Sequence, residues 1–143
     1  MENTQVAVVK DKVQRYLLEV LNTVSVDRDG DFTFREGSAR VFVSVDGVGD
    51  NSASVRIVAP IVNDAPSSPE LFKYIAIDGS YRFGHLTCQE KDGKVSILFV
   101  HSLLGDFLDP DELKLAVFLM ARTADELDDE IVKKFGGRKF HVD

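Results

Sequence analysis

The sequence predicts a two-layer α+β domain in which helices cover one face of an antiparallel sheet. Apolar residues recur at three- and four-residue steps near both ends of the chain, and at two-residue steps between them. The breaks between alternating stretches are short, which favours antiparallel pairing. The expected order is α-β-β-β-α-β-β-α, and 143 residues suit one domain spanning residues 1–143.

The first half of the chain is expected to hold one helix and three strands. Residues 4–24 repeat apolar side chains at helical spacing, and the turn Asp27-Arg28-Asp29-Gly30-Asp31 ends that repeat. Alternation then predicts strands over residues 32–35, 39–45 and 55–61.

Helix boundaries in the second half carry clear start and stop signals. Residues 63–69 hold two prolines and two serines and are expected to break the sheet. Ser68-Pro69 suits an N-cap and a first helical position, and that helix should end near Asp78-Gly79. The last helix opens in the same way at Asp109-Pro110 and should close at Gly136-Gly137.

A hairpin is expected from residues 81–90 and 94–102, because Asp92-Gly93 suits the two positive-φ positions of a two-residue turn. That register pairs Lys91 with Lys94 and therefore sets every other pair. The pairs of interest are His85 with Val100, His101 with Gly84, and Cys88 with Ile97.

The same register bears on metal binding and thiol chemistry. It places His85 and His101 on opposite faces, so they cannot share a metal ion. Cys88 falls on the core face without a nearby base, and we expect a buried, unreactive thiol.

Composition excludes several classes of function. Lys and Arg number 17 against 24 Asp and Glu, a net charge of −7, which disfavours nucleic acid and favours basic partners. No apolar run approaches the roughly 20 residues that span a bilayer. The start Met1-Glu2-Asn3-Thr4 lacks the basic residues of a signal peptide, and one cysteine fits a reducing cytoplasm.

No motif supports catalysis, a metal or a cofactor. Asp27, Asp29 and Asp31 match the first ligands of a calcium loop, but Phe32 replaces the required glycine and Ser38 the bidentate acid. The acids over 125–130 are interpreted as a solvated helix face. Phosphate-cradling loops and nucleophile elbows are absent from the sequence.

One apolar group lies on the face away from the expected helices, where alternation should give polar residues. Its members are Phe42, Val58, Phe83, Leu98 and Val100. The polar positions around them are Arg40, Ser44, Arg56, Thr87 and Ser96. An apolar centre with a polar rim is typical of a binding surface. The alternative, that the first helix or a loop covers this face and makes it core, stays open.

A series of short motifs occurs in a fixed order from about residue 6 to residue 140. They are Gly37–Val43, Ala59–Val62, Ser68–Leu71, Phe83-Gly84, Leu103–Asp106 with Leu108-Asp109, Glu112-Leu113, Ala124-Asp125 and Phe135–Arg138. The ordered set resembles the actinobacterial branch of proteins related to YbjN and to type III secretion chaperones of the CesT class. Asp78 departs from the pattern, because the family often has asparagine there.

The resemblance implies the same element order, peptide binding, chaperone-like activity and often a homodimer. It carries over no catalytic residue. Together with the sequence it predicts a cytoplasmic, non-catalytic domain that binds an extended or amphipathic segment of a partner protein. The alternative is a homodimeric regulatory or scaffold protein whose apolar face is its dimer interface.

Overall fold

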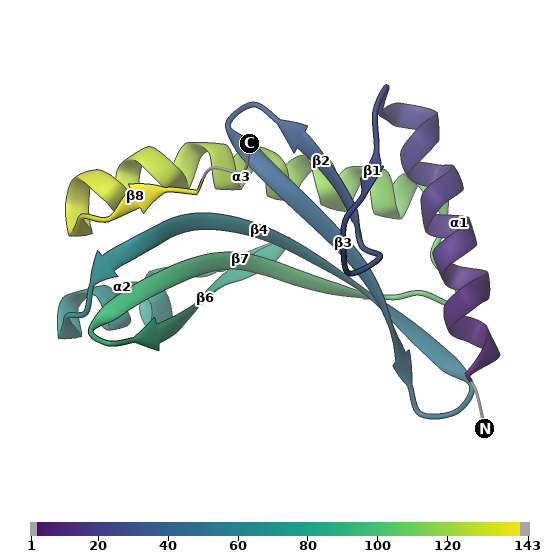
Figure 1. The fold of residues 1–143 in the computed structure, drawn as a ribbon, viewed down its shortest axis with the longest axis horizontal. Coiled ribbons are helices and arrows are strands. Elements are labelled where there is room, and N and C mark those ends of the chain that lie inside the picture. The colour runs from purple at the N-terminus through teal and green to yellow at the C-terminus, as the bar shows by residue number, and fades with distance from the viewer. Residues whose placement is uncertain (1–2, 141–143) are drawn as a thin grey trace.

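The computed structural model describes residues 3–140 (Figure 1). Its elements, in chain order, are α1 (Thr4–Val20), β1 (Ser25–Val26), β2 (Phe32–Glu36), β3 (Ala39–Val48), β4 (Ser52–Pro66), α2 (Pro69–Asp78), β5 (Ser80–Tyr81), β6 (Gly84–Lys91), β7 (Lys94–Leu104), α3 (Pro110–Phe135) and β8 (Arg138–Lys139). The predicted order therefore gains the two-residue strands β1, β5 and β8.

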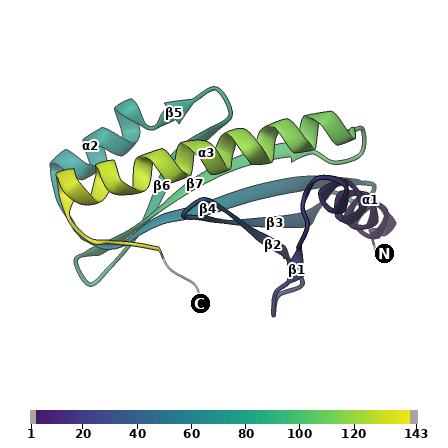
Figure 2. The same cartoon turned by 90° about the horizontal axis from the view of Figure 1, so that it is seen from above.

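The strands form one open antiparallel sheet in the order β1-β2-β3-β4-β7-β6-β5. The strand β8 pairs with β4 at Val62 and Asn63, beyond the stretch of β4 that pairs with β3. Figure 2 shows α2 and α3 together on one side of the strands. The predicted α+β class with helices on one face of an antiparallel sheet is confirmed.

Helix ends follow local chemistry. The Ser68 side chain accepts a hydrogen bond from the Leu71 N–H, and Asp109 accepts one from the Glu112 N–H. Both predicted starts are therefore confirmed. The first helix is shorter than the expected 4–24, because Leu21 is already extended and its N–H caps the helix.

The strand β4 is longer than expected. Residues 63–66 were predicted to break the sheet, but β4 runs on to Pro66. Two register shifts against β7, one on each side of Val62, let it bend, and Asp64 adopts a φ of 58° within the second. The residues predicted to break the sheet are therefore accommodated as β-bulges, and β4 continues through them.

The hairpin register is confirmed. Asp92 and Gly93 have φ of 54° and 76°, and Lys91 pairs with Lys94. The predicted strand over 81–90 is wrong at its start, because the chain turns at residues 82–83 between β5 and β6. Gly84, at φ 126°, begins β6, where a Cβ would lie 2.7 Å from the Phe99 ring.

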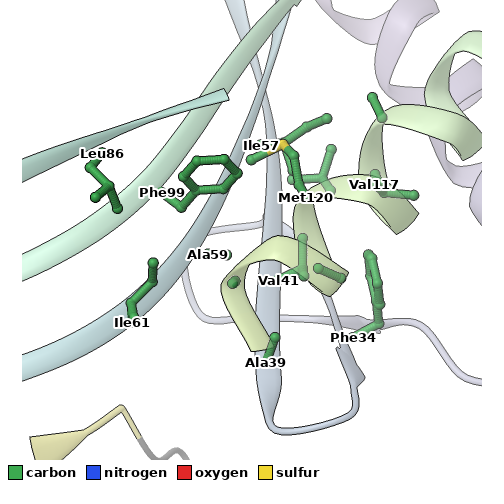
Figure 3. Packing of buried hydrophobic residues seen from close by; sticks show 14 of the residues in the cluster. Phe34, Ala39, Val41, Ile57, Ala59, Ile61, Leu86, Phe99, Val117 and Met120 are labelled. Atoms are coloured by element: carbon green, nitrogen blue, oxygen red, sulfur yellow. The ribbon is translucent and has the colours of Figure 1, made fainter. Parts of the chain in front are cut away.

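The main core lies between the helices and one face of the sheet. Val117 and Met120 of α3 belong to the same buried cluster as Val41, Ile57 and Phe99 of the central strands (Figure 3). The buried residues that α1 adds at the end of this layer are Val9, Val13 and Leu17. The opposite face of the strands, toward the viewer in Figure 1, has no helix over it.

Candidate functional site

A row of apolar side chains crosses the centre of the uncovered face, here called the open face. Phe42 of β3 pairs with Val58 of β4, which pairs with Val100 of β7. Leu98 lies on the same side of β7, two residues from Val100. We call these four residues the open-face cluster. Val100 is 5% exposed and the other three are partly buried.

Phe140 extends this cluster, and sequence analysis did not find it. Its ring packs edge-on against Phe42, with ring centroids 6.4 Å apart, and its N–H donates to the Ile61 carbonyl. The residue is placed by β8, whose partner strand lies far away in the sequence. A lone aromatic after Arg138-Lys139 was the available signal, and alternation alone could not position it.

Phe83 stands apart from the four residues of the cluster. It lies in the turn between β5 and β6, and its ring packs edge-on against His101 at 6.2 Å. Strand alternation puts His101 on the side of Phe99, opposite to Val100. The expected position of Phe83 on a strand of the open face is therefore wrong, because the chain turns at residues 82–83 and β6 begins only at Gly84.

Two arginines flank the apolar row. Arg40 lies two residues from Phe42 on β3, and Arg56 lies two residues from Val58 on β4, so that one stands on each side of the row. Arg56 is exposed. The Nε of Arg40 is buried and has no hydrogen-bond partner among the described residues. The rim of the cluster is thus cationic at both of its long sides.

The acids late in α3 are not simply a solvated face. Asp128 is 5% exposed, and the Ser38 hydroxyl lies within hydrogen-bond distance of Asp125 and Asp128. The bonds from Ser38 hold the pKa of the Asp125 carboxyl below its usual value. Lys139 of β8 pairs with Asp129 at 2.5 Å. These acids therefore join α3 to the β2–β3 turn and to β8.

Cys88 pairs with Ile97 as expected, but it is only partly buried. It lines a cleft of about 390 Å³ between α2 and β6, together with Ile75 and Leu86. Burial, followed by the nearby Glu90 carboxylate, raises the pKa of the thiol. The expectation of full burial is wrong, because β6 lies near the sheet edge and β5 covers only its first residues.

Histidines and acids do not gather into a metal site in the described part of the chain. His85 pairs with Val100, as the hairpin register predicted. Within residues 3–140, no three His, Cys, Asp or Glu side chains group closely enough to hold a metal ion. In the same range no helix combines the length and the apolarity that a bilayer-spanning segment requires.

Comparison with protein families supplies the identification. Residues 5–143 match the model of a family described as type III secretion system (YopN, CesT) and YbjN peptide-binding chaperone 1. The chain belongs to this family. The resemblance to YbjN and CesT-class chaperones is thereby confirmed, and placement in an actinobacterial branch stays a prediction. No curated protein sequence matches the chain.

The fold also matches a solved structure. The crystal structure of the ExsC–ExsE complex contains a chain that is 13% identical and aligns with a TM-score of 0.62. The alignment covers 90% of this chain and 96% of that one. At this identity the likeness shows a shared fold. The family is described by peptide binding and not by a reaction, which fits the expectation of a non-catalytic protein.

Proposed function

We propose that this protein is a non-catalytic, cytoplasmic chaperone-like or regulatory domain that binds an extended or amphipathic segment of a partner protein on its open face. The observation that carries the proposal is the contiguous apolar row of Phe42, Val58 and Val100 on a sheet face without a helix over it. Membership of a peptide-binding family supports it.

Binding would work by removing apolar surface of both molecules from water. The partner's apolar side chains would pack on the open-face cluster, while the arginines and the polar rim stay hydrated. A second mode is backbone pairing at the sheet edge. β5 pairs only with Gly84 and His85, so the rest of β6 has no strand on the side away from β7 among the described residues.

A seam between two copies of the chain is the alternative occupant of this face. In that case the protein is a homodimer with a regulatory or scaffold role, and the open-face cluster is buried by a second copy. The two alternatives predict different behaviour of one variant, because loss of a seam gives monomers and loss of a peptide site does not.

The test uses Phe42→Asp, with Leu98→Asp as a second variant nearer the rim. A charge in a desolvated contact costs several kcal/mol, so both should abolish binding to an array of synthetic apolar peptides. The matched control is Leu115→Asp, which changes an exposed leucine on α3 that is 53% exposed. Circular dichroism reports folding and light scattering reports mass.

Folded variants that lose the peptides, beside a control that keeps them, support the proposal. Folded variants that become monomers while the parent is a dimer favour the seam. Unfolding of both variants would assign the face to the core, and full peptide retention in both folded variants would reject it as a binding site.

A further inference from the structure

The open face carries a charge opposite to that of the molecule. The net charge of −7 led to the expectation of a basic partner. Register and alternation place the following charged residues on the same side as Phe42: Arg35, Arg40, Arg56, Lys91 and Lys94, with Asp46 as the one carboxylate among the paired strand positions described. Burial, followed by the charges of Asp27, Asp29 and Asp46, raises the pKa of Asp31, so carboxylates gather at the Asp46 end of the sheet. The charged residues that flank the cluster itself are Arg40 and Arg56, and the local charge there favours an anionic partner.

The two arginines nearest the cluster have a defined separation. Arg56 pairs with Ser44, which lies four residues along β3 from Arg40. A strand rises about 3.4 Å per residue, so the two arginines are separated by about 14 Å along the strand direction. The pair of Phe42 and Val58 lies between them.

Arg40 has unused hydrogen-bonding capacity. Its Nε is buried without a partner among residues 3–140, which is a costly arrangement for a guanidinium. A carboxylate accepts two parallel hydrogen bonds from an arginine and is the side chain that best satisfies this group. Arg40 as a residue is only partly buried, so an acid on the open face would approach the part of its guanidinium that is not closed off, rather than the buried Nε.

We propose that the open face selects acidic segments, with an acid, an apolar residue and a second acid at alternate positions of an extended peptide. This inference rests on the proposed function and names the class of partner. Side chains at alternate positions of an extended peptide point the same way, and the first and fifth residues lie about 14 Å apart. The acids then reach Arg40 and Arg56 while the central side chain packs on Phe42 and Val58.

Nucleic acid is a poorer occupant of the same arginines. Phosphates would meet Arg40 and Arg56, but an apolar row lies between them where a backbone needs cations. The net charge of −7 also repels a long polyanion. A short acidic peptide with an apolar centre matches both features.

The experiment measures fluorescence anisotropy of three labelled peptides that share a central Leu. They carry Glu, Gln or Lys two positions away on each side. The variants are Arg40→Gln, Arg56→Gln and Arg40→Lys, which keeps the charge but loses the paired hydrogen bonds. Arg122→Gln is the control, since it removes one positive charge from an exposed position on α3. A labelled single-stranded oligonucleotide is a further probe.

We expect the Glu peptide to bind most tightly. Arg40→Gln and Arg56→Gln should each weaken it by about three- to tenfold and leave the Gln peptide nearly unchanged, while Arg122→Gln has no effect. The preference should shrink between about 50 and about 300 mM salt. Arg40→Lys should fall between parent and Arg40→Gln.

Equal binding of the three peptides, or an equal effect of Arg122→Gln, would overturn the charge inference. So would tighter, arginine-dependent binding of the oligonucleotide. If the charge inference is overturned in any of these ways while Phe42→Asp still abolishes peptide binding, the proposed function stands without the preference for acidic peptides. If Phe42→Asp leaves peptide binding intact, the proposed function fails as well.

Discussion

Individual side chains in this protein take their acid–base character from packing. Desolvation, followed by the charge of Glu130, raises the pKa of Tyr74 to about 12. Desolvation, followed by the neighbouring His85, lowers the pKa of His101. In both cases burial disfavours the charged form, and the same effect acts on the single thiol.

Cys88 should react slowly at neutral pH, because its raised pKa keeps the thiol protonated. The rate of labelling by a thiol reagent should climb as the pH rises beyond the ordinary thiol range. The control is Gln89→Cys in a Cys88→Ser background, which moves the thiol to an exposed neighbouring position. Equal labelling rates of the two proteins at pH 7 would contradict the assignment.

The raised pKa also links the thiol to stability. The unfolded chain ionises Cys88 at a lower pH than the folded chain does. Its contribution to stability is therefore complete below the unfolded pKa and declines as the pH rises toward the folded one.

At the level of elements, the turn at Asp92-Gly93 fixes the register of β6 and β7. Gly93→Val should cost about 1–3 kcal/mol, because a β-branched residue is strained at a φ of 76°. Space is not the cause, since a Cβ there would have no atom within 4 Å. Urea denaturation gives the free energy of unfolding. Lys91→Val places a valine in a strand instead of the turn and should change the free energy of unfolding little. Equal losses of stability in both variants would show that the positive φ at residue 93 is not the cause.

Elements with local signals could be predicted from the sequence, and elements with distant partners could not. Ser68, Asp109 and the turn at Asp92-Gly93 act within a few residues, so their helix starts and hairpin register are as expected. β8 consists of two residues that pair with a strand more than 70 residues earlier. No local pattern specifies such a pair. Turn-forming residues around Asp64 are compatible with a bulge inside a strand as well as with the end of a strand, so the sequence could not distinguish the two.

The same division applies to the candidate site across the whole molecule. Alternation within β3, β4 and β7 correctly grouped Phe42, Val58, Leu98 and Val100. It missed Phe140, which reaches Phe42 through tertiary structure alone. The burial of the Arg40 Nε without a partner also depends on tertiary packing, so it could not be predicted from composition or net charge.

Phe140 should contribute measurably to the stability of the whole fold. Phe140→Ala removes the edge-on contact with Phe42, and such aromatic pairs contribute about 0.5–1.5 kcal/mol beyond their burial. We expect a loss of at least that size in the free energy of unfolding. Phe107→Ala is the control, because Phe107 is 88% exposed. An unchanged midpoint for Phe140→Ala would mean that the ring does not stay on the sheet.

The pairing of β8 with β4 has a consequence for how the protein is made. Arg138 bonds Asp64 across 74 positions of the chain, so β4 leaves the ribosome long before its partner is synthesised. During that interval the N–H and C=O groups of β4 near Val62 and Asn63 lack this partner, and an unpaired strand edge is a template for pairing with another chain. While it is being synthesised, the protein therefore exposes the kind of unpaired segment that chaperones bind. This exposure ends when β8 is made and pairs with β4.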